Sequence, residues 1–410
     1  MKVLIVTQYY WPEVFHINEV AASLVAEGCS VDVLTGKPNY PSGRIFNDYK
    51  FWGVVREAHS GVRIFRVPVA PRGSGGALRL IWNYLSFVFM GVLLGPWVLR
   101  RRDYDVIFVY APSPILQALP AILLSRIKRC KTVIWIQDLW PESLEATGYL
   151  VNRFALKLVK KVVRWIYRRS DLLLVQSRAF IPSVSAMAPG KRIIYHPNSV
   201  DDIFILPTDP SVVLPSIPAL NEGFSILFAG NVGTGQALDG ILNAAELLLG
   251  YPQISLVLLG KGSRWEWMKR EVTKRKLINI HMPGRFPLRT MPGLMQRADA
   301  LLVTLDDKPV FALTVPNKIQ AYLAVGKPIV ACLNGEGARI VEEADAGLTV
   351  PPNDGPKLAA AILKLYRLPF IERDKLGRNG KCYFNDKFHH QKLVKELIND
   401  LLKPYWEGKS

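Results

Sequence analysis

Short apolar segments rich in β-branched residues alternate with amphipathic segments along most of the chain. Such segments predict parallel strands joined by crossover helices, because strands buried on both faces are apolar along their whole length. The predicted strands are residues 3–7, 30–35, 106–109, 132–136, 172–175 and 193–195, and then 225–229, 255–259, 278–282, 300–304, 328–331 and 347–350. Helical patterns cover residues 19–27, 238–249 and 266–276. The alternation predicts an α/β fold with two doubly wound, Rossmann-like domains facing a central cleft.

A segment rich in proline and aspartate, residues 201–223, separates the two series of strands and has no periodicity. It is typical of a linker, and a chain of 410 residues exceeds what one hydrophobic core usually serves. We expect an N-terminal domain of residues 1–205 and a C-terminal domain of residues 206–389. Basic helices in residues 390–410, which end near Trp406, are expected to pack back on the first domain.

Residues 80–99 form an apolar segment without a charge, and Arg100, Arg101 and Arg102 follow it. A helix needs about 20 apolar residues to span a bilayer core. Strand patterns stand on both sides of this segment, so a single span would separate two halves of one sheet. We expect a helix or helical hairpin that enters one leaflet, and a helix buried in the protein is the alternative. The membrane-binding residues predicted here are Trp82, Phe87, Phe89, Trp97, Arg100 and Arg101.

The formal net charge of +18 calls for an anionic partner. Residues 153–169 hold seven basic and no acidic residues, interleaved with apolar ones at helical spacing. This amphipathic pattern favours the surface of an anionic membrane, although an ordinary solvated helix face would look similar. Its predicted membrane-binding residues are Lys157, Lys161, Arg164 and Arg168. No zinc finger, helix-turn-helix or RNP-like motif is present, so nucleic acid is not the expected partner.

Four widely spaced cysteines form no CxxC motif or Cys/His cluster, and the acidic pair Asp306–Asp307 has no supporting context. We therefore expect reduced thiols, no metal site and no cofactor. The first apolar run lacks the charged region, longer apolar core and cleavage site of a signal peptide. These features predict a peripheral or monotopic protein on the cytoplasmic face of the inner membrane.

The strand at residues 225–229 leads into a glycine-rich loop, Gly230-Asn231-Val232-Gly233-Thr234-Gly235. Glycines let backbone amides approach a phosphate, and the start of the following helix adds a favourable dipole. The spacing differs from the dinucleotide fingerprint GxGxxG, so an ordinary tight turn between strand and helix is an equal alternative.

Two further segments are expected beside this loop. A helix that begins at Pro316-Asn317 places Lys318 and Gln320 in its first turn. Glu336 lies in another glycine loop, after the strand at residues 328–331. Because the carboxyl ends of parallel strands meet at one edge of a sheet, the three segments are expected to form one ligand site.

Six sequence blocks carry a family resemblance over nearly the whole chain: MKVLIVTQYYWPE at residues 1–13, VIWIQDLWPES at 133–143, IIYHPNSVDDIF at 193–204, LFAGNVGTGQ at 227–236, LLGKG at 258–262 and PNKIQAYLAVGKPIVA at 316–331. Together they resemble the family 4 retaining glycosyltransferases of the GT-B fold. The DLWPES, GNVGTGQ and KIQAYLA blocks are most similar to the WbuB-type L-fucosamine transferases of bacterial surface polysaccharide assembly.

This resemblance implies a retaining transfer of a sugar from a UDP-sugar to an acceptor linked to polyprenyl diphosphate. The sugar implied is an N-acetylated deoxy-amino sugar such as FucNAc. A nucleotide-sugar epimerase of related fold and a non-catalytic membrane-associated scaffold are the alternative functions.

The resemblance also assigns site residues. The predicted donor-binding residues are Gly230, Asn231, Gly233, Lys261, Arg285, Phe286, Asn317, Lys318, Gln320 and Glu336, and the predicted catalytic residues are Asp138, His16 and Glu13. Asp138 is expected to orient the acceptor or accept its proton, and capping of the following turn is the alternative. Phe286 could equally belong to the core, and His16 to an ordinary surface.

This sequence departs from the family pattern in the donor site. The Arg and Lys that grip the diphosphate in many relatives correspond to Asn231 and Gln236 here, and the paired glutamates to Leu313 and Ala321. The cation for the diphosphate is therefore expected from Lys318, with Lys261 and Arg285 as the next candidates.

Overall fold

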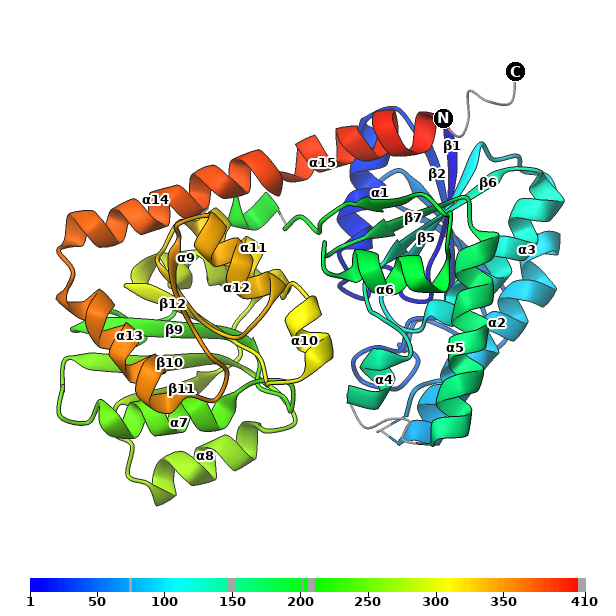
Figure 1. Cartoon of the computed structure of the whole chain (residues 1–410). Helices are drawn as coiled ribbons and strands as arrows, with labels where there is room; N and C mark the ends of the chain where they lie inside the picture. The colour runs from blue at the N-terminus through cyan, green and yellow to red at the C-terminus, as the bar shows by residue number, and fades with distance from the viewer. Residues whose placement is uncertain (74–75, 147–151, 201, 206–210, 405–410) are drawn as a thin grey trace. The chain divides into compact units, whose positions relative to one another are not determined.

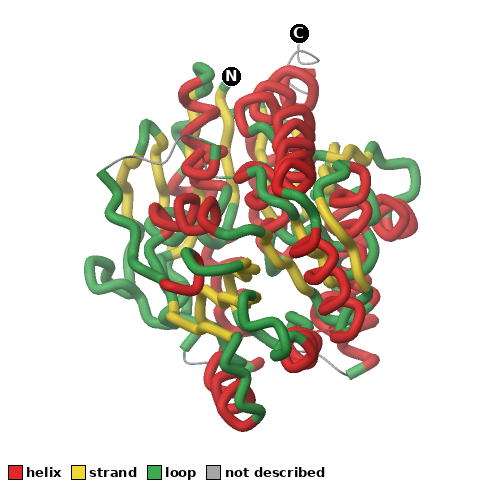
Figure 2. The backbone as a smooth tube through the Cα atoms, turned by 90° about the vertical axis from the view of Figure 1, so that its left-hand side faces the viewer, coloured by secondary structure: helices red, strands yellow, loops and turns green. Residues whose placement is uncertain are grey.

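The computed structural model describes residues 1–73, 76–146, 152–200, 202–205 and 211–404. They form two compact units: unit 1 holds Met1–Pro197 and the chain from Gln391 onward, and unit 2 holds Asn198–His390. The chain thus passes into unit 2 after Pro197, upstream of the boundary predicted at residues 205 and 206. Residues 201 and 206–210 of the predicted linker lie outside the described residues, as does Trp406. Figure 2 shows the strands lying between layers of helices.

Unit 1 contains one eight-stranded sheet, of order β3-β4-β2-β1-β5-β6-β7-β8 among the described residues. Its strands are β1 (Lys2–Val6), β2 (Ser30–Gly36), β3 (Val55–His59), β4 (Val62–Val67), β5 (Val106–Ala111), β6 (Lys131–Ile136), β7 (Leu172–Val175) and β8 (Ile193–Tyr195). All neighbouring strands are parallel except β3 and β4, which are antiparallel.

The hairpin of β3 and β4 was not among the predicted strands. β3 (VREAH) is an edge strand, exposed or half-exposed along its length, so its sequence lacks an apolar run. β4 (VRIFRV) carries two arginines. Arg66 is fully buried there and is compensated by the Glu57 carboxylate and, at 3.1 Å, by the carbonyl of Gly36. The ion pair between the buried Arg66 and the partly exposed Glu57 therefore interrupts the apolar pattern that identifies the other strands.

The helices of unit 1 are α1 (Ile17–Ala26), α2 (Ala77–Val98), α3 (Ala118–Lys128), α4 (Glu142–Ala146), α5 (Arg153–Arg169), α6 (Phe180–Met187) and α15 (His390–Glu396), with a 3-10 turn at Ile115–Gln117 and a π-helix at Leu397–Leu402. α1 packs with Val394, Leu397 and Leu402 of the C-terminal segment in one core cluster on the sheet. α2, α3 and α5 lie together on the other side of unit 1 (Figure 1).

Unit 2 contains a six-stranded parallel sheet of order β11-β10-β9-β12-β13-β14. Its strands are β9 (Phe224–Asn231), β10 (Ile254–Lys261), β11 (Ile280–Gly284), β12 (Ala300–Thr304), β13 (Ile329–Cys332) and β14 (Gly347–Val350). Its helices are α7 (Leu238–Leu247), α8 (Trp265–Lys274), α9 (Met291–Arg297), α10 (Pro309–Leu313), α11 (Asn317–Val325), α12 (Glu336–Glu343), α13 (Gly355–Arg367) and α14 (Phe370–Lys387), with 3-10 turns at Asp202–Phe204, Pro218–Leu220 and Leu288–Thr290. Each of its strands corresponds to a predicted one.

The strand order of each sheet marks where a ligand is expected. Successive strands extend in both directions from β1 in unit 1 and from β9 in unit 2. In doubly wound sheets, ligands bind outside the carboxyl ends of the strands at this switch point. The loops that follow β1 and β9 are therefore the first places to examine, and the prediction of two doubly wound α/β domains is confirmed.

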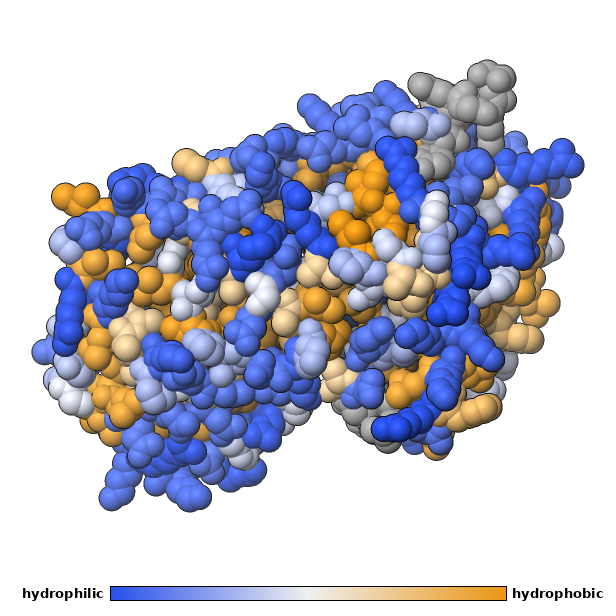
Figure 3. Space-filling view, viewed as in Figure 1, coloured by the Kyte–Doolittle hydropathy of each residue, from blue (hydrophilic) through white to orange (hydrophobic). Residues whose placement is uncertain are grey.

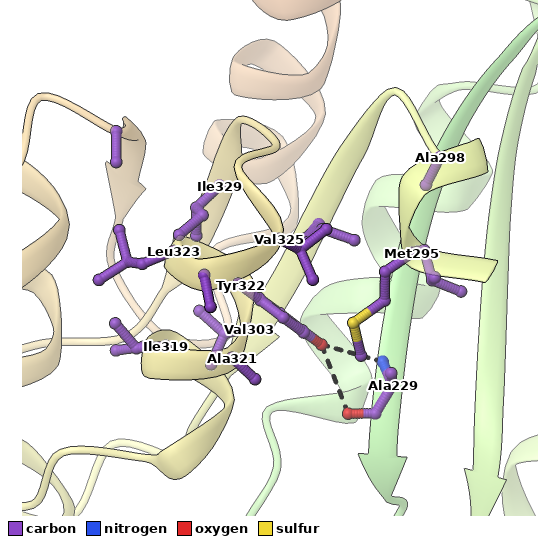
Figure 4. Packing of buried hydrophobic residues seen from close by; sticks show 14 of the residues in the cluster. Ala229, Met295, Ala298, Val303, Ile319, Ala321, Tyr322, Leu323, Val325 and Ile329 are labelled. Atoms are coloured by element: carbon purple, nitrogen blue, oxygen red, sulfur yellow. Dashed lines mark hydrogen bonds between the residues drawn. The ribbon is translucent and has the colours of Figure 1, made fainter. Parts of the chain in front are cut away.

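The end of β9 is fixed by a buried tyrosine from α11. The Tyr322 hydroxyl lies 3.0 Å from the backbone nitrogen of Ala229 and 3.4 Å from its carbonyl oxygen, among apolar residues that include Met295 and Val303 (Figure 4). Tyr322 is fully buried. This contact holds α11 against the strand that leads into the glycine loop.

Candidate active site

In unit 2, β9 and β10 each carry a glycine as their last residue but one. Gly230 and Gly260 are register partners, and both have a positive φ, of 136° and 141°. A Cβ on Gly260 would lie 1.8 Å from the carbonyl oxygen of Gly230, and a Cβ on Gly230 would lie 2.7 Å from Cε of Lys318. A side chain at either position would collide with the protein itself, so the close approach of β9, β10 and Lys318 requires glycine at both positions.

Lys318 lies in the first turn of α11 and reaches over the end of β9. Its ammonium lies 3.7 Å from the centroid of the Phe228 ring and donates to Oε1 of Gln236 at 3.0 Å. The structure shows no acidic partner for Lys318 in the described part of unit 2. Burial lowers the pKa of Lys318 to about 7. An amine held in this way gains most from an anionic ligand, which would restore its charge.

Gln236 was recognised in the sequence only as a departure from the family pattern. The structure shows what it does: its amide oxygen holds the ammonium of Lys318. The cation thus comes from α11 instead of from the loop after β9. Gln236 and Lys318 lie 82 positions apart in the chain, and no local sequence pattern links residues at that separation. The hint in the sequence was that the Arg and Lys expected in the loop after β9 are absent.

Asn231 and Lys261 end β9 and β10 as register partners, and both are exposed. The backbone N–H of Val232 donates to the carbonyl of Lys261 at 3.0 Å, which closes the loop against β10. A Cβ on Gly233 would lie 2.7 Å from Nδ2 of Asn231. Gly230, Asn231, Gly233, Lys261 and Lys318 are therefore gathered at one edge of the sheet.

The remaining predicted donor residues lie in different surroundings. Arg285 is exposed just beyond β11, at the edge of the sheet, and Phe286 packs against a hydrophobic core cluster. Oδ1 of Asn317 accepts a hydrogen bond from Asn198 at 3.0 Å. Gln320 is fully buried, and neither its amide nitrogen nor its oxygen has a hydrogen-bond partner among the described residues. Glu336 is buried in the first turn of α12 and pairs with Arg339 at 2.8 Å.

In unit 1, two histidines flank the buried ring of Trp135. The ring centroids of His16 and His196 lie 5.8 and 5.0 Å from that of Trp135. Nε1 of Trp135 donates to the carbonyl of His196 at 2.9 Å. Burial, and then the neighbouring charge of His16, lower the pKa of His196 to about 3. His196 is therefore a neutral imidazole; it had been noted only as part of a turn after a predicted strand.

Asp138 follows the carboxyl end of β6 and is only partly buried. Burial of its carboxyl group raises the pKa of that group to about 7. Its charge also acts on Tyr110 of β5 and Tyr167 of α5, since it contributes to the raised pKa of both. A carboxylate with this pKa, at the carboxyl edge of the sheet, is suited to accept a proton near neutral pH.

Glu13, a predicted catalytic residue, lies in the loop after β1 and not at an open surface. It is buried, and its carboxylate accepts hydrogen bonds from the backbone N–H groups of Tyr10, Asn39 and Tyr40, at 3.3, 2.8 and 2.7 Å. Burial raises its pKa to about 7, against the effect of these hydrogen bonds. Glu13 joins the loop after β1 to the loop after β2, and its catalytic role stays a prediction.

α2 is the described helix that is long and apolar enough to cross a membrane, judged by length and composition alone. Its exposed apolar residues recur at helical spacing: Leu78, Ile81, Trp82, Leu85, Phe89, Val92, Leu93 and Trp97. Arg100 and Arg101 are exposed just beyond its end. Phe87 was wrongly assigned to the membrane-binding residues, because it is fully buried on the opposite face of the helix.

α5 has the bounds of the predicted basic segment, and the side chain of Asn152, the residue before it, caps its first turn. Lys157, Lys161, Arg164 and Arg168 are exposed on it, together with Phe154, Leu158 and Trp165. Hydrophilic side chains cover the surface at the position of α5 in Figure 3. Val163, Ile166 and Tyr167 are buried and anchor the helix to unit 1.

Among the described residues, no three His, Cys, Asp or Glu side chains are grouped so that they could hold a metal ion. The candidate groups at the two sheet edges are instead the lysines Lys261 and Lys318, two carboxyl groups with a raised pKa, Glu13 and Asp138, and the histidines His16 and His196. This set can bind a diphosphate in unit 2 and a hydroxyl group in unit 1.

The fold resembles solved structures over its whole length. One is titled trehalose-6-phosphate from Escherichia coli bound with UDP-2-fluoro glucose, and it matches with a TM-score of 0.73 and 13% sequence identity. The match covers 98% of this chain and 99% of that chain. This similarity shows that the chain has the same fold as these solved structures.

Family models then match both halves of the chain. Residues 14–199 match the glycosyl transferase 4-like domain, and residues 223–367 match the glycosyl transferases group 1 family. The chain belongs to the family 4 glycosyltransferases of the GT-B fold. The transferase is therefore an enzyme, and the epimerase and scaffold alternatives are not favoured.

Two curated relatives of the transferase are bacterial. "Probable glycosyltransferase WbjE" of Pseudomonas aeruginosa is 26% identical over 322 residues, which cover 76% of this chain and 80% of the relative. "Putative colanic acid biosynthesis glycosyl transferase WcaI" of Escherichia coli K12 is 22% identical over 427 aligned positions, which cover 98% and 100%.

Proposed function

We propose that this transferase moves a sugar, with retention of configuration, from a UDP-sugar to a sugar linked to polyprenyl diphosphate in bacterial surface polysaccharide biosynthesis. The observation that carries this proposal is the ammonium of Lys318, which Gln236 holds beside Gly230 near the end of β9. A cation at the first turn of a helix, at the carboxyl edge of a doubly wound sheet, is suited to a diphosphate.

In the proposed reaction, the acceptor hydroxyl attacks the anomeric carbon while the diphosphate leaves from the same face. The bond between that carbon and the diphosphate oxygen breaks, and its electron pair stays on the diphosphate. Lys318 and backbone N–H groups stabilise the developing negative charge. Asp138, whose pKa is raised to about 7, accepts the proton that the hydroxyl loses. Neither role requires a metal ion.

The donor and the pathway rest on similarity. The related fold solved with UDP-2-fluoro glucose supports a UDP-linked donor. The name of the WcaI relative supports polysaccharide biosynthesis. The resemblance of GNVGTGQ and KIQAYLA to WbuB-type enzymes supports an N-acetylated deoxy-amino sugar such as FucNAc as the transferred group.

The purified transferase should convert polyprenyl-diphosphate-linked GlcNAc to a product heavier by one sugar when it is given the right UDP-sugar. A panel of UDP-sugars, with product masses read by mass spectrometry, tests this expectation. Turnover should be unchanged by a chelator, because no metal takes part in the proposed step. A requirement for added Mn²⁺ would contradict metal independence, and sugar transfer only to water would contradict the acceptor class.

We also propose that unit 1 binds the cytoplasmic face of the inner membrane. The exposed apolar face of α2 and the basic face of α5 support this proposal, since together they match the apolar and the anionic layers of a bilayer surface. α2 is about one-third buried in the protein over its most apolar window, which favours a helix lying in one leaflet over a free span.

Changing Lys157, Lys161, Arg164 and Arg168 to glutamine should weaken binding to vesicles that contain anionic lipids. Each basic residue near such a surface contributes about 1 kcal/mol, so four changes should lower the partition constant about a thousandfold. Vesicle sedimentation measures this constant. A control variant changes Lys269, Lys274, Lys364 and Lys375 of unit 2, which are also exposed. Equal losses of vesicle binding in both variants would show that binding depends on the net charge of the protein and not on the basic face of α5.

A further inference from the structure

The loop between β4 and α2 holds an arginine fixed in place without an acidic partner. The guanidinium of Arg72 lies over the rings of Tyr9 and Tyr40, at 5.8 and 5.2 Å from their centroids. Its Nη1 donates to the Tyr9 hydroxyl at 3.3 Å, and its backbone N–H donates to Oδ1 of Asn39 at 3.2 Å. These contacts fix the guanidinium plane and leave most of its five N–H donors unused.

A second arginine approaches the same loop. Arg79, in the first turn of α2, lies so close to Gly73 that a Cβ there would be 2.9 Å from Nη1 of Arg79. Gly73 directly follows Arg72 in the chain. In the part of unit 1 that the structure describes, no Asp or Glu carboxylate lies within 4.0 Å of either guanidinium.

The start of α2 adds to the positive charge of this loop. The first turn of this 22-residue helix holds no acidic residue, and it carries Arg79. The amino end of a helix has a partial positive charge and favours anions. Two guanidinium groups beside such an end repel each other and the helix dipole. A bound anion would remove this repulsion, and a diphosphate has the charge and the oxygen geometry for two arginines.

An apolar surface begins at the same place. Leu78, Ile81 and Trp82 are exposed in the first turns of α2, and Leu85 and Phe89 continue the same face. A molecule that joins a diphosphate to a long hydrocarbon chain therefore matches both features. Its charged end would lie at Arg72 and its hydrocarbon chain along α2.

We propose that Arg72, assisted by Arg79, binds the diphosphate of the lipid-linked acceptor. This inference rests on the proposed function, and it adds the residues in unit 1 that recognise the acceptor. The donor diphosphate is a different ligand, because the donor cation, Lys318, belongs to unit 2. The Asn39–Tyr40 segment that supports Arg72 is also hydrogen-bonded to Glu13, so the loop after β1 and the acceptor site share one framework.

The test compares Arg72→Ala, Arg72→Lys and Arg79→Ala with the wild-type enzyme in detergent micelles. Arg72→Ala should raise KM for polyprenyl-diphosphate-linked GlcNAc at least tenfold and leave KM for the UDP-sugar unchanged. Arg72→Lys should recover part of this loss, since it keeps the charge but not the planar fork. Arg79→Ala, an exposed position, should show a smaller effect in the same direction. On a GlcNAc alkyl glycoside without diphosphate, all variants should match the wild type.

Direct binding separates this inference from the proposed function. Binding of a fluorescent polyprenyl diphosphate without sugar should depend on Arg72 and not on Arg192, an exposed arginine before β8 that serves as the control. Binding that depends on Arg72 in an enzyme that transfers no sugar would refute the proposed function alone. If Arg72→Ala still transferred sugar with an unchanged KM for the lipid-linked acceptor, the inference about Arg72 would be refuted and the proposed function would stand. A raised KM for the UDP-sugar, or a loss of vesicle binding only, would also overturn it. Thermal melting confirms that each variant is folded.

Discussion

Replacing Lys318 with methionine is expected to lower kcat/KM for the UDP-sugar about 10²–10³-fold, the loss typical of removing one group that stabilises developing charge. Methionine keeps the apolar contact with Phe228 and removes the ammonium that lies 3.7 Å from that ring. Steady-state kinetics with varied donor measure the loss. Lys375→Met, at an exposed position of α14, is the control and should leave kcat/KM unchanged.

The same lysine gives donor binding a defined pH dependence. Burial lowers the pKa of Lys318 to about 7, so at pH 8 most of the free enzyme carries a neutral amine there. A bound diphosphate favours the charged form and raises that pKa. UDP should therefore take up a proton on binding at pH 8, and its affinity should fall as pH rises above about 7. Calorimetry in two buffers of different ionisation enthalpy detects this proton. Identical proton uptake in Lys318→Met would refute the assignment.

Asp138→Asn is expected to lower kcat about 10²–10⁴-fold, the range for removal of a general base, with KM for the UDP-sugar unchanged. In the wild type, kcat should fall as pH falls through about 7, because the carboxylate then takes up a proton and cannot accept another. The asparagine variant should lack this limb of the pH profile. Asp103→Asn, at an exposed position beyond α2, should behave like the wild type.

Stability gives a second measurement on Asp138. Its pKa in the folded protein lies above that of an unfolded chain, so the unfolded state releases its proton first as pH rises. The free energy of unfolding should therefore decrease between about pH 4 and pH 7, and this decrease should be smaller in Asp138→Asn. Chemical denaturation at several pH values measures it. If the asparagine variant lost activity but kept the full pH dependence of stability, another group would have the raised pKa.

The strands that could be predicted from the sequence are those buried on both faces. β1, β5, β6 and β9 are apolar along nearly their whole length, so they stand out from the chain without further knowledge. β3 and β4 were missed because an edge strand needs no apolar run, and because Arg66 and Glu57 neutralise each other within the fold. An ion pair between two strands is a tertiary feature that has no local pattern.

The candidate site could be predicted by position more readily than by role. The glycine loop after β9 and the aspartate after β6 follow recognisable strands, so their place at the sheet edge follows from the sequence. The roles of Glu13 and Gln236 depend on partners far along the chain: backbone N–H groups of the loop after β2 in one case, and Lys318 in the other. Phe87 was misassigned because apolarity does not tell which face of a helix meets the protein.

The C-terminal segment has a consequence for how the protein is made. Leu397 and Leu402 are fully buried in the same core cluster as Val3 and Ile17, although the whole of unit 2 lies between them in the chain. Domains generally fold as units during synthesis. Unit 2 is contiguous and can fold as soon as His390 has emerged from the ribosome. Unit 1 must wait with an open core until the segment after unit 2 is made, so unit 1 matures last although its first strand is made first.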